Sequence, residues 1–330
     1  VMYAVAINNL ANVIKDTGKL AEAETLLRES LDVRRELYGE NSPVFATALN
    51  NYGRFLLDTG RADEAEPRLR ESLEIRRQID PHSLDAASSL ENLGLAEMER
   101  GRTDEAEILI RESLDIRRTV LGDRHPRLAN NLAMLGPILE RKGEWIAAED
   151  SYREALAILR ETHGEEHPEI GRILQRLGRN LGQQGRLDDS ETVLRRALDM
   201  QRRLLGEDHA NVGSICGELG VVLMRREQPA EAATLFREQV HIYEKRLPPN
   251  HPRTSQGRLR LGQAHLKAKE FEAAEDSLQT VYEIVRLTPT LAVGDTNLLE
   301  SARNALIELY EATEQPERAK LLRNEDAQAP

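Results

Sequence analysis

Apolar residues recur at helical spacing in pairs of neighbouring segments, and residues 43–79 show the pattern most clearly. The first segment places apolar side chains three or four residues apart, at Leu49, Tyr52 and Leu56, which predicts one face of a helix. Pro43 suits the first turn of this helix, and Gly60 suits a left-handed end to it. A second apolar face follows at Ala65, Leu69, Leu73 and Ile75. The pattern therefore predicts two helices joined by a tight turn.

The phrase that joins the two helices returns about every forty-two residues. Its clear forms are TGKLAEAE (17–24), TGRADEAE (59–66), RGRTDEAE (100–107), KGEWIAAE (142–149) and QGRLDDSE (184–191). Altered forms follow as REQPAEAA (226–233), AKEFEAAE (268–275) and TEQPERAK (313–320). A fixed period of this size predicts stacked helical hairpins that bury their apolar faces against one another.

Eight hairpins follow from this count, in one continuous array over residues 1–330 without an internal boundary. The expected hairpins span about 1–39, 43–80, 83–121, 126–163, 168–205, 210–247, 252–286 and 296–324, followed by a polar tail at 325–330.

Small residues recur at fixed places in both helices. One set lies seven residues before the turn: Ala11, Gly53, Gly94, Gly136, Gly178, Gly220 and Gly262. The other lies five residues after it: Ala23, Ala65, Ala106, Ala148, Ser190, Ala232, Ala274 and Ala319. We expect a small residue on each helix at the crossing to let the two axes approach closely.

This combination of small residues, tight turns and two helices per unit resembles the tetratricopeptide repeat. The period of 42, the Asn-Asn-Leu-Ala of 8–11 and the linkers LGDRHP, HGEEHP and LGEDHA are similar to the kinesin-light-chain subtype. The resemblance covers nearly the whole chain. It implies an all-α, right-handed superhelical solenoid of about eight repeats, whose first helices line a concave groove.

The pattern weakens toward the C-terminus, where Glu227, Lys269 and Glu314 replace the turn glycine. Each replacement is expected to cost roughly 1 kcal/mol if the left-handed cap is kept. We expect residues 286–297 to form an irregular connection and residues 296–324 to form a capping hairpin.

Composition narrows the classes of function. The 330 residues hold 45 Lys and Arg against 57 Asp and Glu, a formal net charge of −12, which disfavours general binding of nucleic acid. The single Cys216 excludes an internal disulfide and a multi-thiolate metal site, and we expect it to be small and buried. No apolar run approaches the length of a membrane span.

The chain begins inside the first helix of a repeat, without Met at position 1 and without a signal peptide. We therefore expect it to be part of a longer protein, located in the cytoplasm unless an upstream anchor places it elsewhere. Its oligomeric state is left open.

Histidines stand at a fixed place in the linkers between hairpins: His125, His167, His209 and His251, with His82 offset. Because they follow the repeat, we expect them to hydrogen-bond and pack at the junctions. His163 and His167 are four residues apart, but no third metal ligand lies nearby in the sequence. His265 is expected to be packed in the core.

Motifs of enzymes are absent: there is no phosphate-binding glycine loop, His-Glu-x-x-His, Gly-x-Ser-x-Gly or kinase catalytic phrase. We therefore expect no catalysis, cofactor or metal. The Glu-Ala-Glu runs are interpreted as solvated helix starts, favoured by the helix dipole. The Arg pairs 34–35, 76–77, 117–118 and 202–203 are interpreted as solvated helix ends.

The resemblance also implies which residues bind a ligand. In such arrays the second, fifth, sixth and ninth positions of the first helices face it. In the first three units these positions place polar side chains in the groove: Asn8, Asn9, Asn12, Asn50, Asn51, Arg54 and Asn92. Asparagine offers a donor and an acceptor to an extended peptide backbone. The alternative is that these amides brace neighbouring helices.

The fifth unit carries a basic helical face at Arg172, Gln175, Arg176, Arg179 and Gln183, and the seventh unit adds Gln256, Arg260 and Gln263. Guanidinium groups suit carboxylates or phosphates of a ligand. Alternatively, these arginines pair with glutamates of the next hairpin.

We therefore predict a non-catalytic scaffold that binds an extended, acidic peptide segment of a partner protein in its groove. A rival prediction makes the array the substrate-recruiting or regulatory arm of a larger signalling enzyme, a serine/threonine kinase or a signalling ATPase. Its catalytic domain would then precede Val1.

Overall fold

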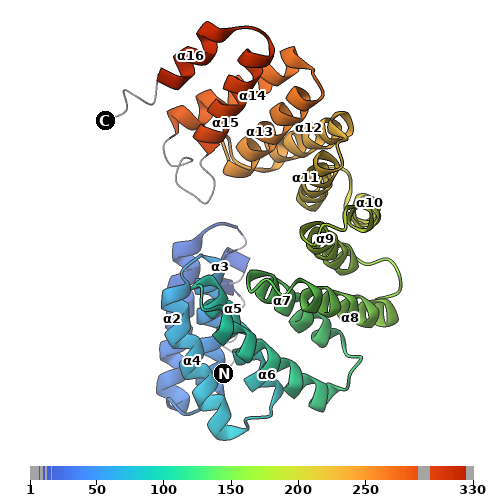
Figure 1. Cartoon of the computed structure of the whole chain (residues 1–330). Helices are drawn as coiled ribbons and strands as arrows, with labels where there is room; N and C mark the ends of the chain where they lie inside the picture. The colour runs from blue at the N-terminus through green and yellow to red at the C-terminus, as the bar shows by residue number, and fades with distance from the viewer. Residues whose placement is uncertain (1–6, 8–9, 12, 16, 289–297, 325–330) are drawn as a thin grey trace. The chain divides into compact units, whose positions relative to one another are not determined.

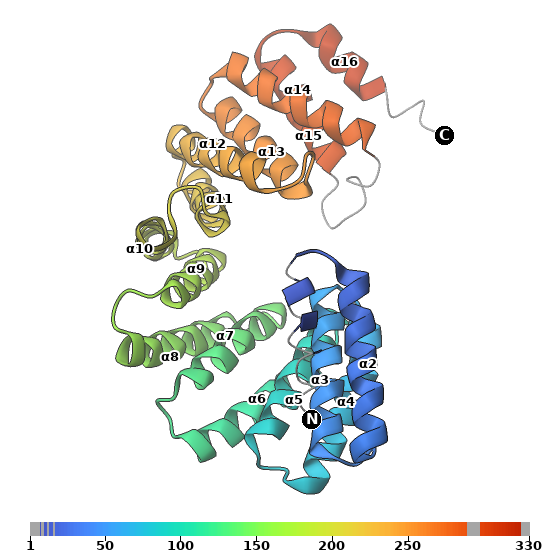
Figure 2. The ribbon, with the colours of Figure 1, turned by 180° about the vertical axis from the view of Figure 1, so that it is seen from behind.

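Regular structure in the described residues consists of α-helices alone. The computed structural model describes residues 7, 10–11, 13–15, 17–288 and 298–324. By its internal contacts the chain divides into two units, Val1–Gly164 and Glu165–Pro330, which are treated separately below. Figures 1 and 2 show both units from opposite sides.

Both units consist of antiparallel helix pairs. Unit 1 contains α2 (Leu20–Tyr38), α3 (Pro43–Asp58), α4 (Ala62–Ile79), α5 (Leu84–Glu99), α6 (Thr103–Leu121), α7 (Pro126–Arg141) and α8 (Trp145–His163). Unit 2 contains α9 (Pro168–Gln183), α10 (Leu187–Leu205), α11 (Ala210–Arg225), α12 (Pro229–Arg246), α13 (Pro252–Lys267), α14 (Phe271–Leu287), α15 (Leu298–Ala312) and α16 (Pro316–Asn324). The odd-numbered helices are the first helices of their repeats and the even-numbered ones the second. The predicted all-α fold of repeated hairpins is confirmed.

The turn inside each hairpin has a left-handed residue, called here the turn position. Gly60 has φ +75°, and the NH of Arg61 donates to the carbonyl of Leu56 at 2.8 Å, closing the end of α3. The substitutes Glu227, Lys269 and Glu314 keep φ between 56° and 61°. The backbone therefore keeps the left-handed turn where a side chain disfavours it, which is the condition under which each replacement is expected to cost roughly 1 kcal/mol.

The linker histidines cap the first helices. The Nδ1 atoms of His125, His209 and His251 each accept a hydrogen bond at 3.1 Å from the backbone NH two residues later, and His167 does so at 3.3 Å. Ser42 fills this role for α3. The prediction that these histidines are structural is confirmed, because each satisfies a free NH of a helix start.

The glycines of the first helices make room for large side chains of the second helices. A Cβ atom on Gly53 would lie 2.5 Å from Cγ of Leu69, and one on Gly136 would overlap the ring of Tyr152. The expected close approach is present. Each glycine receives a bulky residue nine places after the turn, and the small residue five places after it also lies close, since Ser190 Oγ donates to the carbonyl of Gly178 at 2.6 Å.

The interpretation of the arginine pairs as solvated helix ends is wrong for the first member of three pairs. Arg34, Arg76 and Arg117 are each only 5% exposed. Arg76 reaches under α5, where Nη1 donates to the carbonyl of Asp85 at 2.6 Å and to Ser89 Oγ at 2.9 Å. These guanidinium groups are buried because they satisfy polar groups at the start of the next first helix.

The acidic residues after each turn are interpreted from the sequence as solvated helix starts. In the structure, some of them form ion pairs with the next repeat instead. Asp63 and Glu66 both bind Arg100 of the next repeat, at 2.9 and 3.5 Å. Lys142 is held in the same way by Asp104 (3.0 Å) and Glu107 (2.6 Å). These carboxylates join successive hairpins, because the cation lies next to the following turn.

Candidate binding face of the first helices

The first helices of successive repeats lie side by side within each unit. Their backbones approach closely at α3 with α5, at α9 with α11 and at α13 with α15 (Figure 1). The second helices of successive repeats are joined instead by ion pairs between long side chains, such as Arg77–Glu112 and Arg195–Glu231, both at 2.6 Å. The exposed sides of the first helices of each unit are together called here the first-helix face.

Polar side chains on the first-helix face of unit 1 bind one another. Nδ2 of Asn92 on α5 donates to Oδ1 of Asn50 on α3 at 3.1 Å. Arg54 Nη1 donates to Oδ1 of Asn92 at 3.3 Å, and Arg54 Nε donates to Asp58 at 3.0 Å. Asn92 thus uses both ends of its amide to join α3 and α5, as the bracing alternative describes.

The other asparagines predicted to bind peptide are Asn8, Asn9, Asn12 and Asn51. Asn51 is half-buried and has an interaction of its own. Asn8, Asn9 and Asn12 lie outside the described residues. Peptide binding by this set stays a prediction.

In unit 2, the predicted basic face of α9 is also tied to its neighbours. Gln175 Nε2 donates to Ser214 Oγ at 2.8 Å and to Glu218 Oε1 at 3.0 Å, both on α11. Arg172 lies 3.5 Å from Glu169, while Arg176 and Arg179 take part in interactions of their own. Gln183 is exposed.

Three polar side chains of α13 differ, because they keep their capacity to form hydrogen bonds. Gln256, Arg260 and Gln263 lie at i, i+4 and i+7, so they share one face of the helix, and all three are half-buried. Within the described part of the chain, no hydrogen bond or ion pair engages these three side chains. Burial lowers the pKa of Arg260, against the attraction of Glu218.

Glu218 is a member of this face that the sequence pattern did not single out. Arg176, Glu218 and Arg260 each stand nine residues before the turn position of their repeat, on α9, α11 and α13. The first-helix face of unit 2 thus carries a carboxylate between two guanidinium groups. Aligning the repeats on the turn position would have predicted it.

The sequence pattern also missed the buried Glu97 on α5. Its side chain is fully buried, 3.0 Å from Arg70, 3.2 Å from Arg100 and 3.6 Å from Arg102. Burial raises the pKa of this carboxyl. Its place, four residues before the turn, holds leucine in four other repeats, at Leu56, Leu139, Leu181 and Leu223.

No three His, Cys, Asp or Glu side chains cluster as metal ligands in the described ranges, and none of the helices there is both long and apolar enough to cross a bilayer. Cys216 is fully buried, as expected, and burial raises its pKa to about 12. His265 is 3% exposed, as expected for a packed residue.

The sequence profile of the tetratricopeptide repeat matches residues 3–78, 85–161, 135–203, 169–238 and 213–286. Comparison with curated protein sequences gives no match.

Solved structures share the fold. BtubC (BKLC) from P. vanneervenii has a TM-score of 0.62 and 23% identity, over 69% of this chain and 92% of that protein. A putative kinesin light chain from Podosopora anserina, with nearly identical tetratricopeptide-like repeats, has a TM-score of 0.55 and 21% identity, over 62% and 96%. A signal transduction ATPase with numerous domains from Pyrococcus horikoshii, which carries a tetratricopeptide repeat sensor, has a TM-score of 0.68 and 16% identity, over 88% and 43%. The chain therefore belongs to the tetratricopeptide repeat family.

Proposed function

We propose that this chain is a protein-interaction scaffold that holds an extended, acidic segment of a partner protein on the first-helix face of unit 2. The family supports the coarser part of this proposal, because its members bind protein partners. The choice of face and ligand depends on the side chains of α13.

The observation that carries the proposal is the contrast between α13 and the other first helices. Asn92 and Gln175 direct their amides to neighbouring helices, whereas Arg260 is half-buried with no partner among the described residues. Burial removes hydrogen bonds between a guanidinium group and water, which costs free energy. An anion that accepts hydrogen bonds from the guanidinium compensates for this cost. A carboxylate of the ligand would do so, and it would reverse the effect of burial on the pKa of Arg260.

Gln256 and Gln263 would act on the main chain of the ligand. They stand one turn to either side of Arg260 on the same helical face. Each side-chain amide can donate to a carbonyl and accept from an NH of an extended strand. Glu218 would fix the register of the peptide on the first-helix face. It would repel a second acidic residue of the peptide from the side of Arg260 on which Glu218 lies.

The test starts with dodecapeptides selected from a random display library on the full chain. We expect the selected peptides to contain Asp or Glu, and Arg260→Met to weaken their binding at least about tenfold, as for loss of a charge-assisted hydrogen bond. Arg258→Met is the matched control, since Arg258 lies on the same helix but pairs with Glu244 of α12 at 2.6 Å. Equal affinities of wild type and Arg260→Met, measured by fluorescence anisotropy, would exclude the assigned role.

A second candidate function is the regulatory or substrate-recruiting arm of a signalling enzyme. It is favoured by the likeness to the Pyrococcus horikoshii ATPase with a tetratricopeptide repeat sensor, of which the chain spans 43%. Reading the coding sequence upstream of Val1 tests it. Motifs of an ATPase or kinase there support this candidate, and an immediate start codon removes it.

A further inference from the structure

One repeat of unit 1 departs from its own pattern at two places that face each other. Eight residues after the turn position the other repeats carry uncharged side chains, none of which is fully exposed: Leu26, Leu109, Ser151, Val193, Leu235, Ser277 and Leu322. The second repeat has the exposed Arg68 instead. Eight residues before the turn position the repeats carry leucine, for example Leu93, Leu135 and Leu177, but the second repeat has Tyr52.

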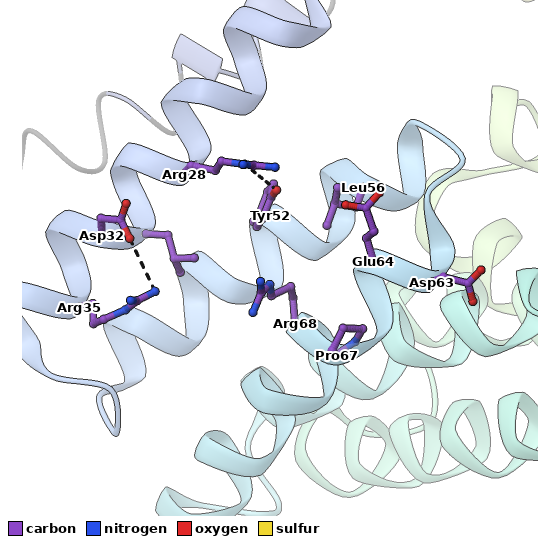
Figure 3. Close-up of a pocket in the computed structure, with 10 residues that line it drawn as sticks. Arg28, Asp32, Arg35, Tyr52, Leu56, Asp63, Glu64, Pro67 and Arg68 are labelled. Atoms are coloured by element: carbon purple, nitrogen blue, oxygen red, sulfur yellow. Dashed lines mark hydrogen bonds and ion pairs between the residues drawn. The ribbon is translucent and has the colours of Figure 1, made fainter.

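A cavity of about 460 Å³ lies where these two replacements meet, among α2, α3 and α4 (Figure 3). Its floor is apolar, formed by the buried Leu31, Tyr52 and Leu56 with Pro67 at the side. In the third repeat the position of Arg68 holds Leu109, which is 7% exposed and packs inward. Arg68 thus lies at the cavity, in the place where the third repeat has a buried leucine.

Three guanidinium groups surround this floor. Arg28 is fixed, because its Nε donates to the Tyr52 hydroxyl at 2.9 Å and its Nη2 pairs with Glu24 at 2.7 Å. Arg35 is held loosely, 3.6 Å from Asp32 and 4.0 Å from Glu40. Arg68 extends from α4 toward Tyr52 (Figure 3), and no described residue forms a hydrogen bond or ion pair with its side chain.

The carboxylates at the cavity are already engaged. Asp63 binds Arg100 at 2.9 Å, and Glu64 binds Arg61 at 2.7 Å. Asp32 is the weak partner of Arg35. The positive charge that remains available thus lies at Arg35 and Arg68, directly beside the apolar floor.

We propose that this cavity is a second binding site, separate from the first-helix face, for a carboxylate side chain that follows an apolar residue in a peptide. The apolar side chain packs on Tyr52 and Leu56, and the carboxylate accepts hydrogen bonds from Arg68 and Arg35. Asp32, Asp63 and Glu64 at the rim favour a single negative charge over the double charge of a phosphate monoester.

The experiment titrates the full-length chain with acetyl-Gly-Leu-Glu-Gly-amide and follows the arginine Nε–H signals by NMR. We expect saturable shifts of Arg68 and Arg35, absent with the matched peptide that has Gln in place of Glu. Arg68→Leu restores the residue type of Leu26 and Leu109, so the fold should be kept while binding weakens at least about tenfold. The control Arg127→Leu removes an exposed cation of α7 and should leave binding unchanged.

The outcomes separate the alternatives. No saturable shift in wild type, or equal binding by wild type and Arg68→Leu, overturns the site. A third peptide has phosphoserine in place of Glu, and its tighter binding than the Glu peptide overturns the carboxylate assignment. Arg260→Met should leave the signals of Arg68 and Arg35 unchanged. A negative result at the cavity therefore does not contradict binding on the first-helix face, and a negative result for the first-helix face does not contradict binding at the cavity.

Discussion

At the scale of single residues, the glycines of the first helices set how closely each hairpin packs. Gly136 is in van der Waals contact with a large aromatic ring and has no room for a methyl group. The turn glycines such as Gly60 have open space around them, and only their positive φ restricts substitution. The same residue type therefore serves two unrelated purposes within one repeat.

We predict that Gly136→Ala lowers the free energy of unfolding by roughly 1–3 kcal/mol, because the added methyl group overlaps Tyr152. Gly257→Ala is the less crowded comparison and should cost less, since its new atom would lie 3.1 Å from Cγ2 of Val240, against 2.2 Å from Cε1 of Tyr152 at Gly136. Urea denaturation of both variants measures the difference. Equal losses would refute the steric explanation.

A second prediction concerns pH and Glu24. The hydrogen bond from Arg61, with those from Tyr52 and Arg28, lowers the pKa of Glu24 from 4.5 to about 2. Because the pKa is lower in the folded state, the stabilisation is complete above pH 4.5 and is lost as the pH falls to 2. We expect Glu24→Gln to destabilise the protein by about 1 kcal/mol at pH 7 and hardly at pH 2. A loss that is independent of pH, measured by urea unfolding, would argue against the ionised pair.

At the scale of helices, polar contacts between repeats decide how one hairpin is joined to the next. The buried Glu97 of α5 is surrounded by Arg70 from α4 and by Arg100 and Arg102 at the following turn. Arg100 in turn binds Asp63 of the preceding repeat. This cluster joins three successive elements, at a place where four other repeats have a leucine.

We expect Arg100→Met to destabilise unit 1 by about 2 kcal/mol, because a buried carboxylate loses a close partner. Arg102→Met should have a smaller effect, since Arg102 is half-exposed and 3.6 Å from Glu97. Hydrogen exchange of α4 to α6 measures both. If the two variants open these helices equally, the ranking by burial is wrong.

Sequence periodicity predicted those features that every repeat shares. The left-handed turns and the capping role of His125 follow the period, so each has one physical explanation that applies many times. Arg76 was misassigned because a helical pattern does not reveal that a long side chain can reach under the next helix. Glu218 and Arg68 were missed because their importance depends on what the equivalent residues of other repeats are.

At the scale of the whole molecule, the chain is acidic, with a formal net charge of −12, and each proposed site contains a guanidinium group that has no hydrogen-bond or ion-pair partner among the described residues. Arg260 lies on the first-helix face of unit 2, and Arg68 lies at the cavity of unit 1. An acidic ligand is thus repelled by most of the surface and attracted locally, which favours specificity over general affinity. Binding at both places should weaken as salt is added.

The most direct test of the account is photo-crosslinking of a selected acidic dodecapeptide to the full chain. A photoreactive phenylalanine derivative is placed at Gln263 on α13, or at the exposed Glu272 on α14 as the matched position on a second helix. We predict a crosslink from position 263 that Arg260→Met removes, and none from position 272. Crosslinking from position 272 alone would contradict the claim that the first helices hold the ligand.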